Sequence, residues 1–188
     1  MDDRRKFLQT AALTMLSMPL AQTAFADDEN PATEMRPQKG DLFVSEDDEK
    51  KIISPSDLQL NQAPLAAFPY DPKGKIVRDG SRLNRVLLVK LDPKTLGETT
   101  RQRATPDGIV AYSGICAHQG CPVTGWIKDQ GIQVMKCFCH NSEYDPAHGA
   151  QVVFGPAPRP LAALPVKIAE GKLVAAGTFI GKVGLQQT

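Results

Sequence analysis

The sequence carries almost no net charge and contains no long apolar stretch. Its 22 lysines and arginines face 21 aspartates and glutamates, and the two signs balance within residues 27–188. This balance argues against nucleic acid or an anionic membrane surface as the partner. The most apolar segment, residues 11–25, has about fifteen residues, fewer than the roughly 20 that a membrane-spanning helix needs. No long segment repeats its apolar residues at helical spacing, which argues against a mainly α fold.

Cysteine and histidine are scarce, yet nearly all of them stand in two short segments. The chain has four cysteines and three histidines. The first box, residues 116–121, reads Cys-Ala-His-Gln-Gly-Cys, and the second box, residues 137–144, reads Cys-Phe-Cys-His-Asn-Ser-Glu-Tyr. The two boxes hold every cysteine and all histidines except His148, which follows in a turn and is expected to be exposed. Thiolates and imidazoles crowded in this way predict a metal site.

The spacing within the boxes indicates which metal site. One residue separates Cys116 from His118, and two residues separate Cys137 from His140, so each box can offer one sulfur and one nitrogen ligand. Two thiolates and two imidazoles are the ligand set of a Rieske-type 2Fe–2S centre, in which two histidines replace two cysteines on one iron. The sequence therefore predicts this asymmetric cluster.

Cys121 and Cys139 are left over, one in each box, and in an oxidising compartment they can pair.

Three simpler interpretations compete with the cluster. Two structural disulfides would use all four cysteines but would leave both histidines without a role. A structural zinc site could take two cysteines and two histidines, although zinc knuckles normally use C-x₂₋₄-C pairs. A redox dithiol normally has a C-x-x-C motif, which neither box contains.

The two boxes resemble the C-x-H-x-G-C and C-x-C-H-x-S-x-Y signature of high-potential Rieske iron–sulfur proteins. The resemblance extends over about residues 107–161. It implies that Cys116 and Cys137 bind one iron of the cluster, and that His118 and His140 bind the other. In this family the histidine ligands lie outermost, so the resemblance also implies that electrons leave through the imidazole edges.

The resemblance assigns roles to other residues of the same region. It implies a disulfide between Cys121 and Cys139. It also implies that the hydroxyls of Ser142 and Tyr144 donate hydrogen bonds to cluster sulfur or a ligand cysteine, which raises the reduction potential. The proline-rich segment, residues 155–160, corresponds to a loop that covers the cluster in the family.

The N-terminus has the three-part layout of an export signal. Arg4 and Arg5 precede Phe-Leu, an apolar run follows, and Ala24-Phe25-Ala26 forms a small-x-small cleavage site before an acidic stretch. The paired arginines resemble a twin-arginine (Tat) signal. We therefore expect a signal peptide at residues 1–26 and a periplasmic protein, with an uncleaved membrane anchor as the alternative.

The rest of the chain predicts a mainly β protein. Short apolar or alternating runs bounded by turn residues predict strands, and a short helix is expected at 99–104. The predicted strands are 85–91, 109–113, 123–127, 132–137, 151–154, 164–168, 173–176 and 179–183. The family resemblance implies an antiparallel β-sandwich with an inserted cluster-binding subdomain at about 114–160. We expect a flexible lead-in at 27–60 and a Rieske domain at 61–188.

The predicted function is single-electron transfer, without a catalytic site of the chain's own. The expected partner is a larger oxidoreductase subunit, a c-type cytochrome, or both. The resemblance leaves two settings: a soluble periplasmic oxidoreductase, as for the small subunit of arsenite oxidase, or a quinol-oxidising cytochrome bc complex. Gln119 favours the first, because a polar amide is costly to bury in an apolar quinol pocket where the second type typically has leucine.

Overall fold

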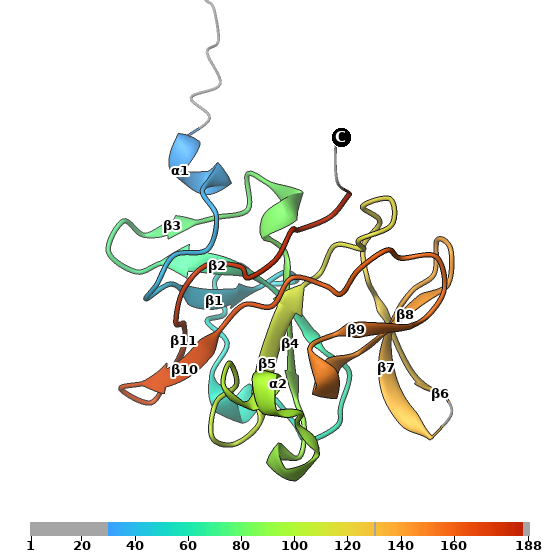
Figure 1. Ribbon diagram of the computed structural model, residues 1–188. Helices are drawn as coiled ribbons and strands as arrows, with labels where there is room; N and C mark the ends of the chain where they lie inside the picture. The colour runs from blue at the N-terminus through green and yellow to red at the C-terminus, as the bar shows by residue number, and fades with distance from the viewer. Residues whose placement is uncertain (1–29, 130, 186–188) are drawn as a thin grey trace, which may run out of the picture.

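The computed structural model describes residues 30–129 and 131–185, and the predicted signal at 1–26 lies outside them. Within the described residues the fold is mainly β, as predicted, and neighbouring strands pair antiparallel (Figure 1). In this part of the chain no helix is both long and apolar enough to cross a bilayer.

The strands are short and follow one another with few helical residues between them. They are β1 Leu42–Ser45, β2 Leu65–Asp71, β3 Ile76–Val77, β4 Val86–Lys90, β5 Ile109–Ser113, β6 Gly125–Asp129, β7 Ile132–Cys137, β8 Ser142–Asp145, β9 Gln151–Phe154, β10 Val166–Ala169 and β11 Lys172–Ala175. The helical turns are α1 Pro31–Glu34, η1 Pro55–Asp57, η2 Arg82–Asn84, η3 Pro93–Thr95, α2 Glu98–Arg101 and η4 Pro146–His148.

The central sheet has the order β1-β2-β4-β5, with β3 paired to β2. Its strands β4 and β5 are apolar at nearly every position because both of their faces are buried. One face, with Leu88 and Ile109, packs against residues of the β10–β11 hairpin. The other face, with Leu87 and Tyr112, packs against the part of the chain that carries the two boxes. Figure 1 shows β4 and β5 between these two layers.

The second sheet, β6-β7-β8-β9, is formed entirely within residues 125–154. It thus falls inside the predicted subdomain at 114–160. Cys137, the last residue of β7, pairs with Ser142, the first residue of β8. The turn between them therefore consists of residues 138–141, and it is closed by Asn141 in the left-handed region at φ 59°.

Three boundaries differ from the prediction. The expected lead-in at 27–60 contributes β1 to the central sheet, and Phe43 and Ile53 are fully buried, so the folded domain begins before residue 61. The expected strand at 179–183 is reduced to one bridge between Ala163 and Ile180, because glycines flank so short a segment. The helix expected at 99–104 is shifted to Glu98–Arg101.

Candidate metal centre

The first box is a tight turn that follows the buried strand β5. The N–H of Cys116 donates to the carbonyl oxygen of Cys121 at 2.7 Å, and the N–H of Gly120 donates to the carbonyl oxygen of Cys116 at 3.1 Å. Gly120 has φ +71°, which a glycine adopts at little cost. These bonds close the turn, so that Cys116 is buried while Gln119 is exposed.

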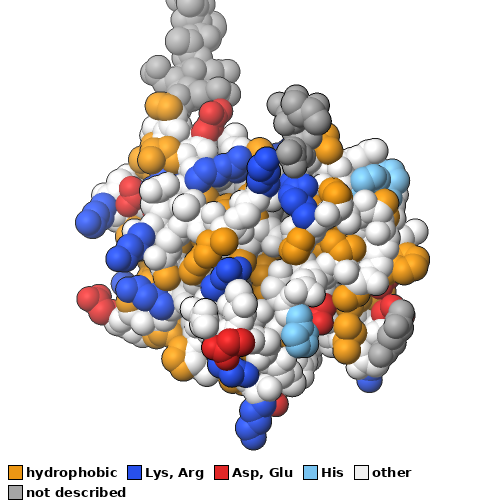
Figure 2. Space-filling view, viewed as in Figure 1, with side chains coloured by type: hydrophobic (Ala, Val, Ile, Leu, Met, Phe, Trp, Pro, Cys, Tyr) orange, Lys and Arg blue, Asp and Glu red, His pale blue; other side chains and the backbone are white. Residues whose placement is uncertain are grey.

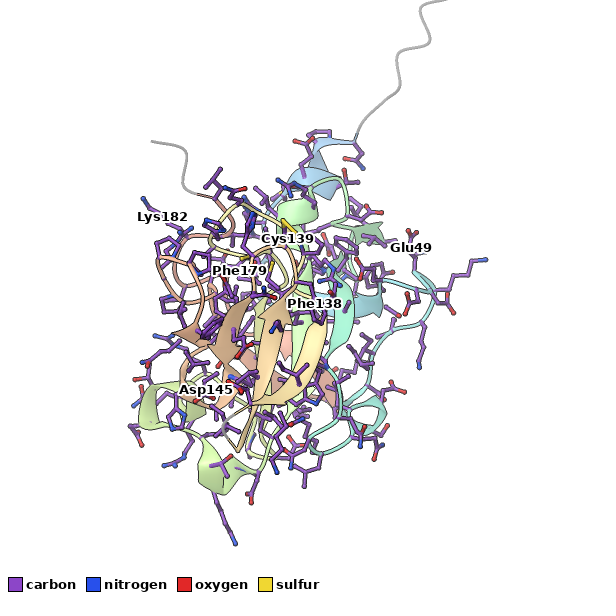
Figure 3. The ribbon with its side chains drawn as sticks, turned by 90° about the vertical axis from the view of Figure 1, so that its right-hand side faces the viewer. Glu49, Phe138, Cys139, Asp145, Phe179 and Lys182 are labelled. Carbon is purple, nitrogen blue, oxygen red and sulfur yellow. A yellow bond between two sulfur atoms is a disulfide. The ribbon has the colours of Figure 1, made fainter. Side chains whose placement is uncertain are left out.

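The second box combines the end of β7, the turn and the start of β8. Cys137 and Ser142 are buried in the strands, whereas Phe138, Cys139 and His140 are exposed on the turn. Figure 3 shows Phe138 and Cys139 together at this turn and Asp145 at the opposite end of the sheet. The change from a buried Cys137 to the exposed residues 138–141 marks the point where the strand ends and the turn leaves the core.

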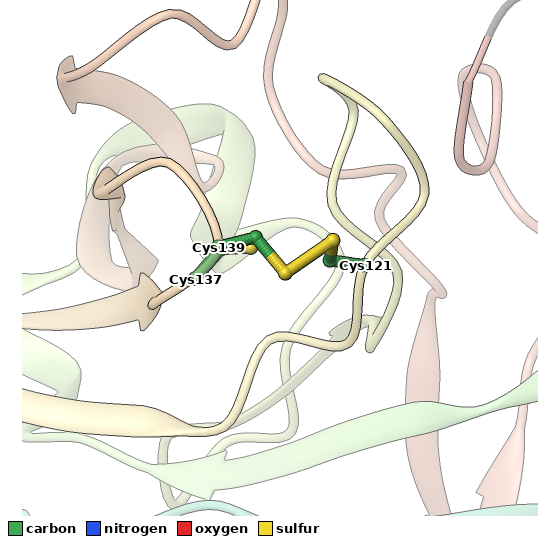
Figure 4. Close-up of side chains that lie close together, drawn as sticks. All are labelled: Cys121, Cys137 and Cys139. Atoms are coloured by element: carbon green, nitrogen blue, oxygen red, sulfur yellow. A yellow bond between two sulfur atoms is a disulfide. The ribbon is translucent and has the colours of Figure 1, made fainter.

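A disulfide between Cys121 and Cys139 joins the two boxes, as the resemblance implied (Figure 4). Their Cα atoms are 6.6 Å apart, and 18 positions separate them in the sequence. The sulfur of Cys137 lies within 4.8 Å of both disulfide sulfurs. Since the disulfide uses Cys121 and Cys139, a three-thiolate site of these residues is not available, and only Cys116 and Cys137 remain as free thiols.

The two histidines of the boxes also meet. Their ring centroids are 4.6 Å apart, and the rings stand nearly perpendicular to each other at 89°. The Nδ1 atom of His118 is buried and has no hydrogen-bond partner among the described residues. A buried nitrogen left without a partner is costly unless it binds something else. His118 Nδ1 is therefore suited to hold a metal ion.

The residues present fit a 2Fe–2S cluster of the Rieske type. Burial raises the pKa of the Cys137 thiol, and the neighbouring thiol of Cys116 raises it further. Without a metal the protonated thiol is thus favoured, whereas as iron ligands Cys116 and Cys137 would be held as thiolates, because a coordinating thiol is deprotonated outright. The site thus offers two thiols that a metal converts to thiolates, beside two imidazoles that lie closer to the surface. Figure 2 shows histidine side chains, coloured pale blue, at the surface of the molecule.

Tyr144 contacts the first box directly. Its hydroxyl oxygen accepts a hydrogen bond from the N–H of Ala117 at 3.2 Å and lies 3.1 Å from the sulfur of Cys116. Because the oxygen already accepts from Ala117, the hydroxyl proton is available to the sulfur. Burial raises the pKa of Tyr144, and the adjacent Cys116 raises it further, so the hydroxyl stays protonated and remains a donor.

Ser142 and the proline-rich loop meet beside the second box. The Ser142 hydroxyl is buried and accepts a hydrogen bond from the N–H of Ala157 at 3.2 Å. Gly155, with φ +88°, packs so closely that an added Cβ would lie 2.6 Å from the backbone oxygen of Asn141. The proline-rich loop therefore rests on the second box, which accords with its implied role as a cover.

We expect Tyr144→Phe and Ser142→Ala each to lower the midpoint potential by several tens of millivolts. Each change removes one donor that favours the reduced cluster, and a net hydrogen bond of about 1.4 kcal/mol corresponds to about 59 mV for one electron. Redox titration of the purified variants measures the shift. Tyr112→Phe is the control, because its hydroxyl donates to the carbonyl oxygen of Pro146 instead. Unchanged potentials in both test variants would show that neither hydroxyl acts on the cluster.

Sequence reasoning missed two arginines that reach the first box. Arg82 Nη1 donates to the carbonyl oxygen of Gly120 at 2.6 Å, and Arg159 Nη1 donates to that of Ala117 at 3.3 Å. No sequence motif distinguishes these two from surface arginines. His148, by contrast, is exposed at the far end of β8, where its Nδ1 lies 2.7 Å from Asp145 Oδ2.

Comparisons with known proteins match the region that contains the two boxes. Residues 90–165 match the Rieske [2Fe-2S] domain family. The Rieske iron–sulfur subunit of the cytochrome bc1 complex of Streptomyces lividans is 32% identical over 163 residues, 82% of this chain and 92% of that protein. Its Streptomyces coelicolor counterpart is 32% identical over 96% of this chain, which spans only about half (53%) of that protein. A putative respiratory nitrate reductase Rieske subunit of Haloferax mediterranei is 37% identical over 57% of this chain and 47% of that protein.

Proposed function

Since this chain belongs to the Rieske iron–sulfur proteins and carries a Rieske-type 2Fe–2S cluster, we propose that it is the Rieske subunit of a cytochrome bc1 complex. In this role it would take electrons from a quinol and pass them to a c-type cytochrome. The observation that carries the proposal is the identity of 32% with the Streptomyces lividans subunit over most of both chains. This setting is the alternative that the sequence left open, and it is now preferred to an arsenite oxidase-like partner.

The cluster, when bound, supplies one-electron transfer. The chain's own residues determine where the electron can enter and leave. Cys116 and Cys137 are buried, whereas His118 is partly exposed and His140 is exposed. A partner that docks on the surface around the two imidazoles comes closest to the site, so we propose this surface as the place of exchange.

A second candidate is the electron-transfer subunit of another respiratory oxidoreductase. The exposed Gln119 favours it, because the amide at the tip of the first box faces solvent and would have to be buried in a quinol pocket. The Haloferax mediterranei relative is named for such a setting. The two candidates share the cluster and differ only in the partner.

We also propose export through the Tat pathway to the periplasm, on the basis of the sequence of residues 1–26. The paired arginines and the cleavage site after Ala26 support it. The double change of Arg4 and Arg5 to lysine should retain the precursor in the cytoplasm, as measured by cell fractionation. Full export of that variant would remove the Tat assignment and leave the cluster assignment intact.

The partner can be tested in membranes of cells that produce the full chain with an affinity tag. We expect quinol-dependent reduction of cytochrome c that is sensitive to quinol-site inhibitors, together with co-purification of a b-type cytochrome. Cys116→Ser should abolish the activity, and His148→Ala, at an exposed histidine outside the site, should leave it unchanged. Isolation of the chain with a soluble oxidoreductase, while quinol oxidation is independent of Cys116, would favour the second candidate.

A further inference from the structure

Arg159 connects the proline-rich loop to the first box. Its Nη1 atom donates to the carbonyl oxygen of Ala117, which lies between Cys116 and His118 in the sequence. Its Nη2 atom donates to the carbonyl oxygen of Gly184 near the C-terminus. Its Nε atom is buried and has no hydrogen-bond partner among the described residues. The guanidinium is thus partly withdrawn from water at the edge of the metal centre.

Arg82 approaches the same box from a different segment, the short η2 turn. Its contact is the carbonyl oxygen of Gly120, and the guanidinium would lie only 3.2 Å from a Cβ at that glycine. Since the N–H of Gly120 in turn donates to Cys116, Arg82 stabilises the turn that presents the ligands. The two arginines thus contact two of the carbonyl oxygens of the first box, those of Ala117 and Gly120.

Within the part of the chain that the structure describes, no carboxylate pairs with either of these two arginines. Arg85 also reaches backbone carbonyl oxygens next to the box, at Gly114 and Val123, but its guanidinium forms a salt bridge with Glu46 at 2.8 Å. Neither Arg82 nor Arg159 forms a salt bridge within residues 30–129 and 131–185. Their positive charge therefore contributes to the electrostatic potential at the metal centre.

We propose that Arg159, assisted by Arg82, is a positioning residue that raises the reduction potential of the cluster. An oxidised cluster with two thiolates and two neutral imidazoles is formally neutral, and reduction adds one negative charge. A nearby positive charge stabilises that extra electron, and more so where burial limits screening by water and salt. Two backbone carbonyl oxygens, those of Ala117 and Gly184, accept hydrogen bonds from the guanidinium and restrict its position more than the single flexible ammonium of a surface lysine would be restricted.

The inference rests on the cluster and not on the proposed bc1 partner, because it concerns the potential of the isolated chain. The test is redox titration of purified full-length protein, with iron and acid-labile sulfide measured in every sample. We expect Arg159→Met to lower the equilibrium constant for reduction about tenfold, which is 59 mV for one electron. Arg159→Lys, which keeps the charge, should recover more than half of that loss.

Two further variants make the result decisive. Lys182→Met removes one exposed positive charge from the C-terminal segment, labelled in Figure 3, and should shift the constant by less than twofold. Arg82→Met should lower it in the same direction as Arg159→Met. A native potential in Arg159→Met with a full cluster, or equal losses in Arg159→Lys and Arg159→Met, would overturn the proposal. If Arg159→Met does not retain the cluster, a native potential in Arg82→Met would overturn it.

Discussion

We expect purified protein to lose its cluster when any one of the four predicted ligands is replaced by a side chain that cannot bind iron. Each box supplies one sulfur and one nitrogen to the predicted ligand set, and the other two cysteine sulfurs nearby are held in the disulfide, so we expect no other side chain to replace a lost ligand. The expected result is a fall of bound iron and acid-labile sulfide to near zero, with loss of the visible absorption. The variants are Cys116→Ser, Cys137→Ser, His118→Ala and His140→Ala.

The control for these variants is His148→Ala. This histidine is exposed and pairs with Asp145 away from the two boxes, so its removal should leave the iron and sulfide content unchanged. A variant at His118 or His140 that keeps a native content and spectrum would contradict the ligand assignment. Loss of the cluster in His148→Ala would show that the site is sensitive to changes that do not touch it.

Removal of the disulfide should destabilise the domain by roughly 3 kcal/mol, because the bond closes a loop of about 19 residues in the unfolded chain. For a domain of this size, that corresponds to a fall in melting temperature of roughly 6 to 12 °C. Thermal unfolding of Cys139→Ser measures the effect, and the variant should also lose its cluster faster on heating.

The double variant with serine at both Cys121 and Cys139 serves as the control. Either single change breaks the same bond, so the single and double variants should unfold at similar temperatures. A double variant as stable as the native protein would mean that the bond does not contribute to stability. Detection of two free thiols in unreduced native protein by mass spectrometry would contradict the disulfide itself.

The centre of the fold could be predicted from the sequence because its signals are local. The apolar runs at 85–91 and 109–113 become β4 and β5, and their continuous apolar character reflects burial on both faces. The metal site could be predicted for the same reason, because the spacing of cysteine and histidine within each box involves only residues that are close in the sequence. The structure brings these boxes together through a disulfide and two adjacent imidazole rings.

Other features depend on contacts between distant segments and leave little or no local pattern; β1, for example, has only the three apolar residues 42–44. β1 follows a polar segment, and its place in the sheet is decided by pairing with β2. The contact of Arg82 with Gly120 spans 38 positions, and that of Arg159 with Ala117 spans 42. From the sequence alone, an arginine on a loop is expected to be exposed to solvent, and only the fold shows which carbonyl oxygen it contacts.

The metal content of the protein purified from its native host tests the central claim most directly. We expect about two irons and two acid-labile sulfides per chain, and a reduced-state EPR signal typical of mixed histidine and cysteine ligation. This result follows if Cys116, His118, Cys137 and His140 bind the cluster and Cys121 is joined to Cys139. Zinc in place of iron, with no acid-labile sulfide, would contradict the account.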